Sequence, residues 1–329
     1  MRRREFITLV GGAGAAWPLS GRAQPRELPV IAVLRAGSGP LSSDESAFQK
    51  GLAESGYLNG QNAIVEYHSF DGHYEHLSGL VADLLARRVA VIATPGFSIT
   101  PTATIVKAAG DSIPVVFGIG NDPVKLGLVT SLARPSGNAT GIYFFVGEVV
   151  AKRLGLLHQL VPGARRISVL VNPNNPVATA DTLEQLNEAT RLLGLEPRIF
   201  EAGTNRDIDA AFETIARERS DALFVGPDAF FNSRRVQFTT LATRHGIPAS
   251  YSNRSYCDVG GLMSYGTNFA EMHRQVGVYT GRILKGAKPA DLPVTQSTKF
   301  EFVINLQTAR ALSIAVPTGL LASADDLIQ

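Results

Sequence analysis

The sequence predicts an α/β protein built from two similar lobes, each a doubly wound parallel sheet. Short, all-apolar runs predict buried strands, and stretches with one apolar face predict helices between them. These units alternate over about residues 30–140 and again over about residues 141–265. The third observation is length, because about 300 residues remain after an N-terminal leader, which suits two domains rather than one.

The first half of the chain reads as alternating strands and helices. The predicted strands are residues 30–34, 63–69, 89–93 and 114–117, and the predicted helices are residues 43–55, 74–88 and about 98–110. Ser42 and Glu45 form a capping box at the start of the first helix, and Gly56 is placed to end it. Residues 94–98 are expected to break the third strand.

The pattern restarts after Gly141. The predicted strands are residues 167–171, 197–200, 222–225 and 248–251, and the predicted helices are residues 181–193, 207–219 and 233–245. Gly194 and Gly246 are placed to end the first and last of these helices. A helix over about residues 269–285, a proline-rich passage over 288–295, a strand over 300–305 and a short helix complete the chain.

Residues 1–23 predict an export signal. Arg2 to Arg4 give a charged start, a weakly apolar stretch runs to Trp17, and Gly21-Arg22-Ala23 offers a small-x-Ala processing site. The apolar stretch is too short to span a bilayer, and its paired arginines resemble the twin-arginine class of bacterial signals. We therefore expect a periplasmic protein that is cleaved near Ala23.

Charge and motif content exclude several function classes. The leader holds four of the 31 basic and one of the 29 acidic residues, so the mature chain is nearly neutral and lacks the basic patch of a nucleic-acid binder. Cys257 is the single cysteine and is expected to be a buried thiol. His73 and His76 have helical spacing without a third metal ligand nearby, and no hydrolase or phosphate-loop motif occurs. No metal, cofactor or enzymatic activity is expected.

Sequence blocks along nearly the whole mature chain carry a family likeness. They lie at residues 48–52, 56–62, 122–124, 127–135, 137–141, 172–175, 260–266 (Gly-Gly-Leu-Met-Ser-Tyr-Gly), 281–293 and 299–305. They resemble the periplasmic substrate-binding proteins of ABC importers, in particular the subgroup with tryptophan- and tyrosine-binding members. The resemblance implies a monomer that captures a small organic solute, favouring an amino acid or aromatic carboxylate, and delivers it to a membrane permease.

The same resemblance implies a periplasmic binding protein-like I fold with a three-segment hinge near Gly141, near Gly266 and over residues 295–300. Lobe 1 is then expected over residues 29–141 plus 266–297, and lobe 2 over 142–265 plus 298–321. Two alternatives stay open: a ligand-sensing domain of a regulator, and an extracytoplasmic enzyme on the same fold. In open α/β sheets, ligands bind beyond the carboxyl ends of the strands, and a cleft between two such lobes closes by hinge motion.

Candidate ligand-binding residues in lobe 1 follow its predicted strands. They are Ser38, Thr94, Gly96, Phe97, Ser98, Asn121 and Asp122. Ser98 begins a helix, where a hydroxyl and free N–H groups suit a carboxylate, although it could simply cap the helix. Asp122 precedes Pro123 and could equally be a turn residue.

Candidates at the lobe 2 side of the cleft also follow strands. They are Tyr143, Asn172, Asn174, Asn175, Asp228 and Tyr251. Asp228 follows a buried strand and is predicted to pair with a ligand ammonium, the alternative being a solvent-exposed carboxylate. The three asparagines offer amide groups or form a turn. The two tyrosines line the cleft against a ring or pack in the core.

Overall fold

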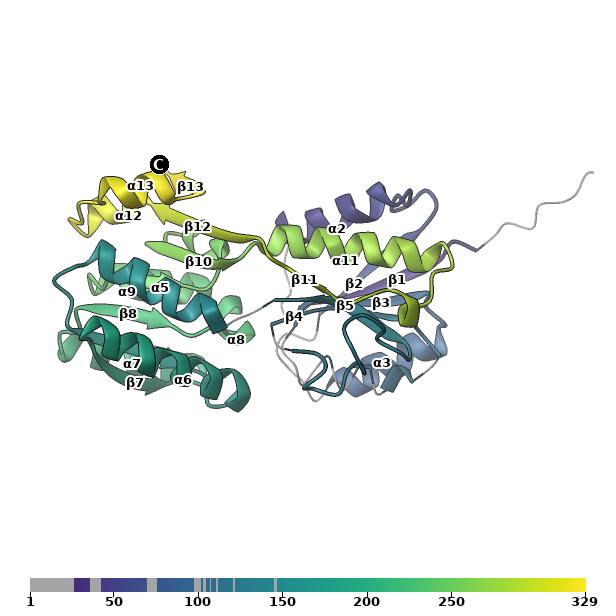
Figure 1. The fold of residues 1–329 in the computed structure, drawn as a ribbon, viewed down its shortest axis with the longest axis horizontal. Coiled ribbons are helices and arrows are strands. Elements are labelled where there is room, and N and C mark those ends of the chain that lie inside the picture. Colours follow the sequence, from purple (N-terminus) through teal and green to yellow (C-terminus); the bar gives the residue numbers. More distant parts are fainter. Residues whose placement is uncertain are drawn as a thin grey trace, which may run out of the picture.

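The computed structural model describes residues 27–35, 43–69, 76–97, 102, 105–106, 108–110, 112–120, 122–144 and 147–329, without the side chains of residues 43, 97, 147 and 148. The predicted export signal and the predicted capping residue Ser42 lie outside these residues. The chain forms two lobes side by side, each with its own sheet (Figure 1).

Lobe 1 is a six-stranded sheet in the order β11-β5-β4-β3-β1-β2, with all its strands parallel. Its strands are β1 (Val30–Arg35), β2 (Ile64–Ser69), β3 (Val91–Phe97), β4 (Val115–Ile119), β5 (Ala139–Tyr143) and β11 (Thr295–Gln296). Helices α2 (Ser43–Glu54) and α11 (Phe269–Leu284) cover one face, and α3 (Leu77–Ala86) covers the other (Figure 1). Ile31 packs with α2 and α11, whereas its neighbour Ala32 packs with α3, as the alternation of a strand requires. The short 3-10 helix η2 (Pro289–Asp291) follows α11.

Helices α2 and α11 pack unusually closely because glycines lie at their contact. A Cβ atom on Gly51 would lie 1.8 Å from the carbonyl oxygen of Arg274. A Cβ on Gly277 would lie 2.2 Å from the carbonyl oxygen of Phe48. The absence of a side chain at these positions lets the two backbones touch.

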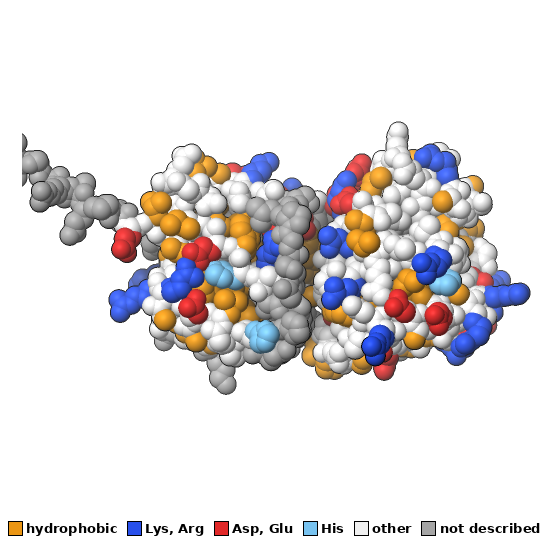
Figure 2. Space-filling model, turned by 180° about the vertical axis from the view of Figure 1, so that it is seen from behind, with side chains coloured by type: hydrophobic (Ala, Val, Ile, Leu, Met, Phe, Trp, Pro, Cys, Tyr) orange, Lys and Arg blue, Asp and Glu red, His pale blue; other side chains and the backbone are white. Residues whose placement is uncertain are grey.

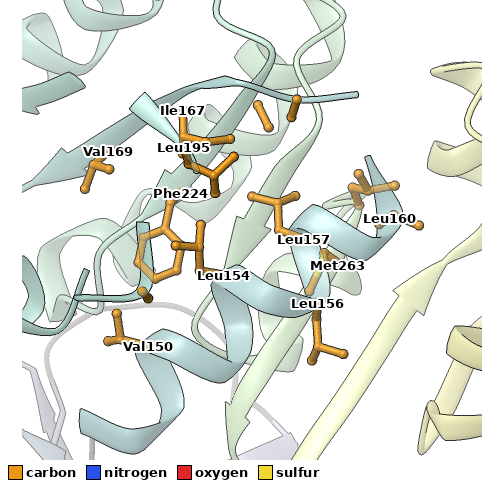
Figure 3. Close-up of a cluster of buried hydrophobic side chains, with 14 of the residues drawn as sticks. Val150, Leu154, Leu156, Leu157, Leu160, Ile167, Val169, Leu195, Phe224 and Met263 are labelled. Atoms are coloured by element: carbon orange, nitrogen blue, oxygen red, sulfur yellow. The ribbon is translucent and has the colours of Figure 1, made fainter. Parts of the chain in front are cut away.

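Lobe 2 is a seven-stranded sheet in the order β13-β12-β10-β9-β8-β6-β7. Its strands are β6 (Arg166–Val171), β7 (Glu196–Glu201), β8 (Ala222–Val225), β9 (Ala249–Tyr251), β10 (Met263–Thr267), β12 (Phe300–Asn305) and β13 (Asp326–Ile328). Its helices are α5 (Gly147–Leu160), α6 (Pro176–Leu193), α7 (Asn205–Arg217), α8 (Ala229–Ser233), α9 (Arg235–Arg244), α10 (Arg254–Cys257), α12 (Leu306–Ala311) and α13 (Thr318–Ser323). On one face of the sheet, α5 contributes Val150, Leu154 and Leu157 to a buried cluster with Phe224 of β8 and Met263 of β10 (Figure 3).

Most predicted elements are present, but the helix α5 (Gly147–Leu160) was not predicted, and further differences follow. The chain continues through Gly141 as β5, because a Cβ there would lie 2.0 Å from the carbonyl oxygen of Phe117 and only glycine permits this approach. β3 continues to Phe97 with an irregularity after Pro95, although a break was expected at residues 94–98. α6 begins at Pro176 and not at residue 181, since proline suits the first position of a helix. β10 was not predicted, and it runs antiparallel to β12 in an otherwise parallel sheet.

The chain passes between the two sheets three times, after β5, after β10 and between β11 and β12. The expected limits at residues 141 and 266 fall inside β5 and β10, so each of these strands extends past them. β13 adds residues 326–328 to the second sheet, beyond the expected end of lobe 2 at residue 321. The division into two folding units remains a prediction. Within the part of the chain that the structure describes, no helix has the length and apolar character to cross a bilayer.

Candidate functional site

A groove separates the two lobes when the molecule is viewed from behind (Figure 2). In lobe 2 a small pocket of about 170 Å³ lies at the carboxyl ends of β6 and β8, beside the first turns of α6. It is lined by Val171, Asn172, Asn175, Ala178, Thr179, Thr182, Gly226, Pro227 and Asp228. Parallel α/β sheets place their ligands at this edge, where the strands end and helices begin. Three of the predicted site residues, Asn172, Asn175 and Asp228, therefore come together.

Asp228 is held in the pocket by three N–H donors. Its Oδ1 accepts hydrogen bonds from Asn172 Nδ2 at 2.9 Å and from the backbone N–H of Phe231 at 3.2 Å. Its Oδ2 accepts a hydrogen bond from Asn175 Nδ2 at 2.9 Å. The bond to Phe231 makes Asp228 the N-cap of α8. A carboxylate has about four lone-pair positions, so it can still accept a further donor from a ligand.

The asparagines serve this pocket unequally. Asn172 is buried, and its side-chain oxygen accepts the backbone N–H of Asn174 at 3.0 Å, which fixes the amide toward Asp228. Asn175 occupies the N-cap position of α6, but its amide donates to Asp228 and not to the helix. Asn174 instead directs its amide to the carbonyl of Gly203 at 3.4 Å. The loop therefore forms a turn and also supplies the side-chain amides of Asn172 and Asn175 to Asp228, whereas Asn174 does not bond to Asp228.

A second polar cluster at the end of β9 was not predicted. Ser255 Oγ donates to Asn232 Oδ1 at 2.8 Å, and Asn253 Nδ2 lies 3.3 Å from the same oxygen. Asn253 also caps α10, accepting the backbone N–H of Ser255. The polar run from Ser252 to Ser255 directly after an apolar strand was the signal for this cluster, and it matches the pattern that identified Asp228.

In lobe 1 the described candidates are Thr94, Gly96, Phe97 and Asp122, whereas Ser38, Ser98 and Asn121 lie outside the described residues. Thr94 is fully buried in β3. Phe97 is the last residue of β3. Asp122 accepts the backbone N–H of Val124 at 2.9 Å, which is the turn that was its alternative role.

Gly96 brings the end of β3 close to the first turns of α11. A Cβ atom on Gly96 would lie 3.6 Å from Cε1 of His273. His273 is buried, and its Nδ1 lies 2.8 Å from the carbonyl oxygen of Phe269, so that nitrogen carries the proton. Burial lowers the pKa of His273 and raises the pKa of Asp44 at the start of α2, and the two groups interact electrostatically. These two groups were not predicted as site residues.

Arg35, the last residue of β1, is a further lobe 1 group that sequence reasoning missed. Its Nη1 donates to Glu45 Oε1 at 2.9 Å, which joins the carboxyl end of β1 to α2. The sequence did contain a signal for this group, because Arg35 directly follows the apolar residues 30–34 of the strand.

The two candidate tyrosines pack in the lobe cores. Tyr143 is buried in β5, and its hydroxyl donates to Gln296 Oε1 at 3.2 Å. Tyr251 is fully buried and stacks on Tyr256 with ring centroids 4.4 Å apart. Its hydroxyl has no hydrogen-bond partner among the described residues. Both rings therefore take the core role that was the alternative to lining the cleft.

Titratable side chains outside the cleft behave as structural groups. Cys257 is buried, as predicted, and burial raises the pKa of its thiol to about 12. His68 pairs with Glu66 at 3.1 Å, and Glu66 also binds Arg87. Across the described ranges, no three His, Cys, Asp or Glu side chains gather as metal ligands would. His73 lies outside those ranges.

Comparisons with known proteins agree on one family. The model of the family described as "ABC transporter substrate binding protein" matches residues 30–328. A tyrosine-binding protein of Clostridioides difficile (strain R20291) is 25% identical over 276 residues, which cover 83% of this chain and 77% of the relative.

Solved structures give the same picture. A conserved domain protein from Vibrio cholerae superposes with a TM-score of 0.81, and an ABC domain in complex with L-Trp from Streptococcus pneumonia superposes with a TM-score of 0.80. Each is 25% identical, and each match covers 92% of this chain and 100% of the other. The predicted fold of two parallel-sheet lobes is confirmed.

Proposed function

Since this chain belongs to the family of ABC transporter substrate-binding proteins, we propose that it captures an amino acid with an aromatic side chain between its lobes and presents it to a membrane permease. In this proposal the protein performs no chemistry on its ligand. The observation that carries the proposal is the pocket at the ends of β6 and β8, where Asp228 is held by two asparagine amides.

The ligand class follows from the relatives and from the charge of this pocket. One relative is a tyrosine-binding protein, and one similar structure holds L-Trp. The hydrogen-bond donors to this carboxylate are all neutral N–H groups, and a ligand ammonium is a partner that would neutralise its charge. We assign the ammonium to Asp228 and the ligand carboxylate to the lobe 1 edge, with Ser98 as the candidate. An affinity near micromolar, about −8 kcal/mol, is expected.

The proposed setting is extracytoplasmic. Residues 1–23 would direct export by the twin-arginine route and be removed near Ala23, leaving a monomeric receptor in the periplasm. Fractionation of cells and the intact mass of the periplasmic protein test this setting. A mass that does not correspond to residues 24–329 would contradict the cleavage site.

Thermal unfolding against a ligand panel tests the function, because a ligand that binds the native state raises the melting temperature with its concentration. The panel is L-tryptophan, L-tyrosine, L-phenylalanine, aliphatic amino acids, tryptamine, indole-3-propionate and small sugars. We expect a saturable rise with one or more aromatic amino acids. A rise with sugars alone would overturn the ligand class.

The variant Asp228→Asn tests the assignment of the ammonium. Asparagine keeps the size and the capping ability of aspartate but lacks its charge, and its NH2 group replaces the oxygen that accepts the amide of Asn175. We expect at least tenfold weaker binding of the aromatic amino acid and unchanged binding of indole-3-propionate, which lacks the ammonium. Asp209→Asn is the matched control, since Asp209 is an exposed carboxylate of lobe 2 that bonds to Gln237 away from the pocket.

A further inference from the structure

Arg153 is a charged side chain buried inside lobe 2, with only 1% of its surface exposed. It lies on α5. Val150 and Leu154 of the same helix pack over Phe224 (Figure 3). The guanidinium carbon of Arg153 is 3.9 Å from the centroid of the Phe224 ring, and its Nη2 donates to the carbonyl oxygen of Val225 at 2.7 Å. Within the described part of the chain, no carboxylate pairs with Arg153, and its Nε has no hydrogen-bond partner.

The burial of Arg153 destabilises the folded state. A buried cation loses its hydration, and a carbonyl and an aromatic face replace only part of it. Burial lowers the pKa of Arg153 to about 9, so the group still carries its charge at neutral pH. An apolar side chain of similar length would fill the same space without that cost, so stability alone does not account for an arginine here.

The position of Arg153 points to a different role. Val225 is the last residue of β8, and Asp228 follows it by one short turn. The turn is fixed on one side by the backbone bond from Gly226 to the Leu170 carbonyl at 2.8 Å, and on the other by Arg153. Arg153 therefore holds the base of the turn that carries the pocket carboxylate.

Tyr256 connects the two charges electrostatically. Its phenol is buried, and burial raises its pKa well above the usual range. The carboxylate of Asp228 raises that pKa further, whereas the Arg153 guanidinium lowers it, so both charges act on the same hydroxyl. The charges of Asp228, Arg153 and Arg235 thus all act on this phenol.

We propose that Arg153 is a positioning residue for ligand binding, which holds the turn between β8 and α8 so that Asp228 meets the ligand ammonium. It also ties this turn to α5, the first helix after the chain crosses from lobe 1. The inference rests on the proposed function, since it assumes an amino-acid ligand at Asp228.

Calorimetric titration with L-tryptophan and L-tyrosine tests the proposal in Arg153→Met and Arg153→Lys. We expect at least tenfold weaker binding in the methionine variant, while its melting temperature is equal to or above that of the wild type. The lysine variant keeps the charge and one donor, and should recover part of the affinity. In an Asp228→Asn background, Arg153→Met should change the affinity by less than twofold, because Arg153 acts through Asp228.

Arg191→Met is the matched control, because Arg191 is an exposed arginine on α6 of the same lobe. Wild-type affinity in Arg153→Met would overturn the inference alone, and so would equal losses in both backgrounds, which indicate a general structural role. If the methionine variant does not fold, the lysine variant carries the same comparison with Asp228→Asn. Absence of binding by the wild-type protein would overturn the proposed function together with this inference.

Discussion

Asp228 does two things with one carboxylate. It caps α8 through Phe231 and collects the amides of Asn172 and Asn175, so it joins the loops that follow β8 and β6. These donors fix the position of the Asp228 carboxylate, but because all of them are neutral, they do not neutralise its charge. A group held in this way needs no rearrangement when a cationic ligand arrives, which favours binding.

Tyr251→Phe separates the core role of this residue from a ligand-binding role. The buried hydroxyl has no partner among the described residues, and removing an unsatisfied buried polar group stabilises a protein. We expect a gain of about 1 kcal/mol in the free energy of unfolding and unchanged affinity for aromatic amino acids. Denaturant unfolding and calorimetric titration measure the two quantities. Weaker ligand binding would show that the hydroxyl reaches the cleft.

Local patterns pointed to the carboxylate and the amides of the lobe 2 pocket but not to the buried Arg153 below, for physical reasons. Asn172 directly follows an apolar run, and Asp228 follows another after Gly226 and Pro227, so the rule for parallel sheets found them without a structure. Arg153 lies in an amphipathic helix, where a single arginine normally faces water. Its burial depends on Phe224 and Val225, which are distant in sequence and reach it only through the fold.

At the scale of elements, glycine explains why β5 was not predicted and why α2 and α11 pack closely. Gly141 was taken as a boundary, but it lets β5 approach Phe117. Continuous apolar runs such as β8 were predicted with their correct bounds, because a strand buried on both faces has no other signature. β10, which contains serine, tyrosine and glycine, lacks that signature and finds its place by pairing with β12.

Gly277→Ala tests the contact between α2 and α11. The added Cβ would meet the carbonyl oxygen of Phe48, which belongs to backbone and cannot give way easily. We expect a loss of about 1–3 kcal/mol in the free energy of unfolding, as for other overpacked sites. Denaturant unfolding measures it.

The matched control for Gly277→Ala is Gly155→Ala on α5, where a Cβ would have no neighbour within 4 Å. There the same substitution should gain about 0.5–1 kcal/mol, since alanine restricts the unfolded chain and favours the helix. Equal effects of the two substitutions would contradict the importance of the close approach.

At the scale of the whole molecule, one lobe offers too little space to enclose a ligand. The pocket in lobe 2 is small and is lined by residues of that lobe alone, whereas sites that bury a small molecule enclose roughly 300–1,000 Å³. Lobe 1 must supply the remainder, and the three passages of the chain between the sheets allow the lobes to approach.

Small-angle X-ray scattering tests this closure. The radius of gyration should fall when L-tryptophan or L-tyrosine saturates the protein, because the ligand binds best where both lobes contact it. Asp228→Asn at the same ligand concentration should show a smaller fall. An unchanged radius at proven saturation would indicate that binding does not bring the lobes together.

The way the lobes share the chain also governs the order of folding during synthesis. Lobe 1 takes α11 and β11 from residues 269–296, and lobe 2 takes β12 and β13 from residues 300–328. A nascent chain that stops before residue 269 therefore holds one sheet lacking a covering helix and another with an unpaired edge at β10. Lobe 1 is complete only at residue 296 and lobe 2 only at residue 328, so the native state forms only after nearly the whole chain has emerged.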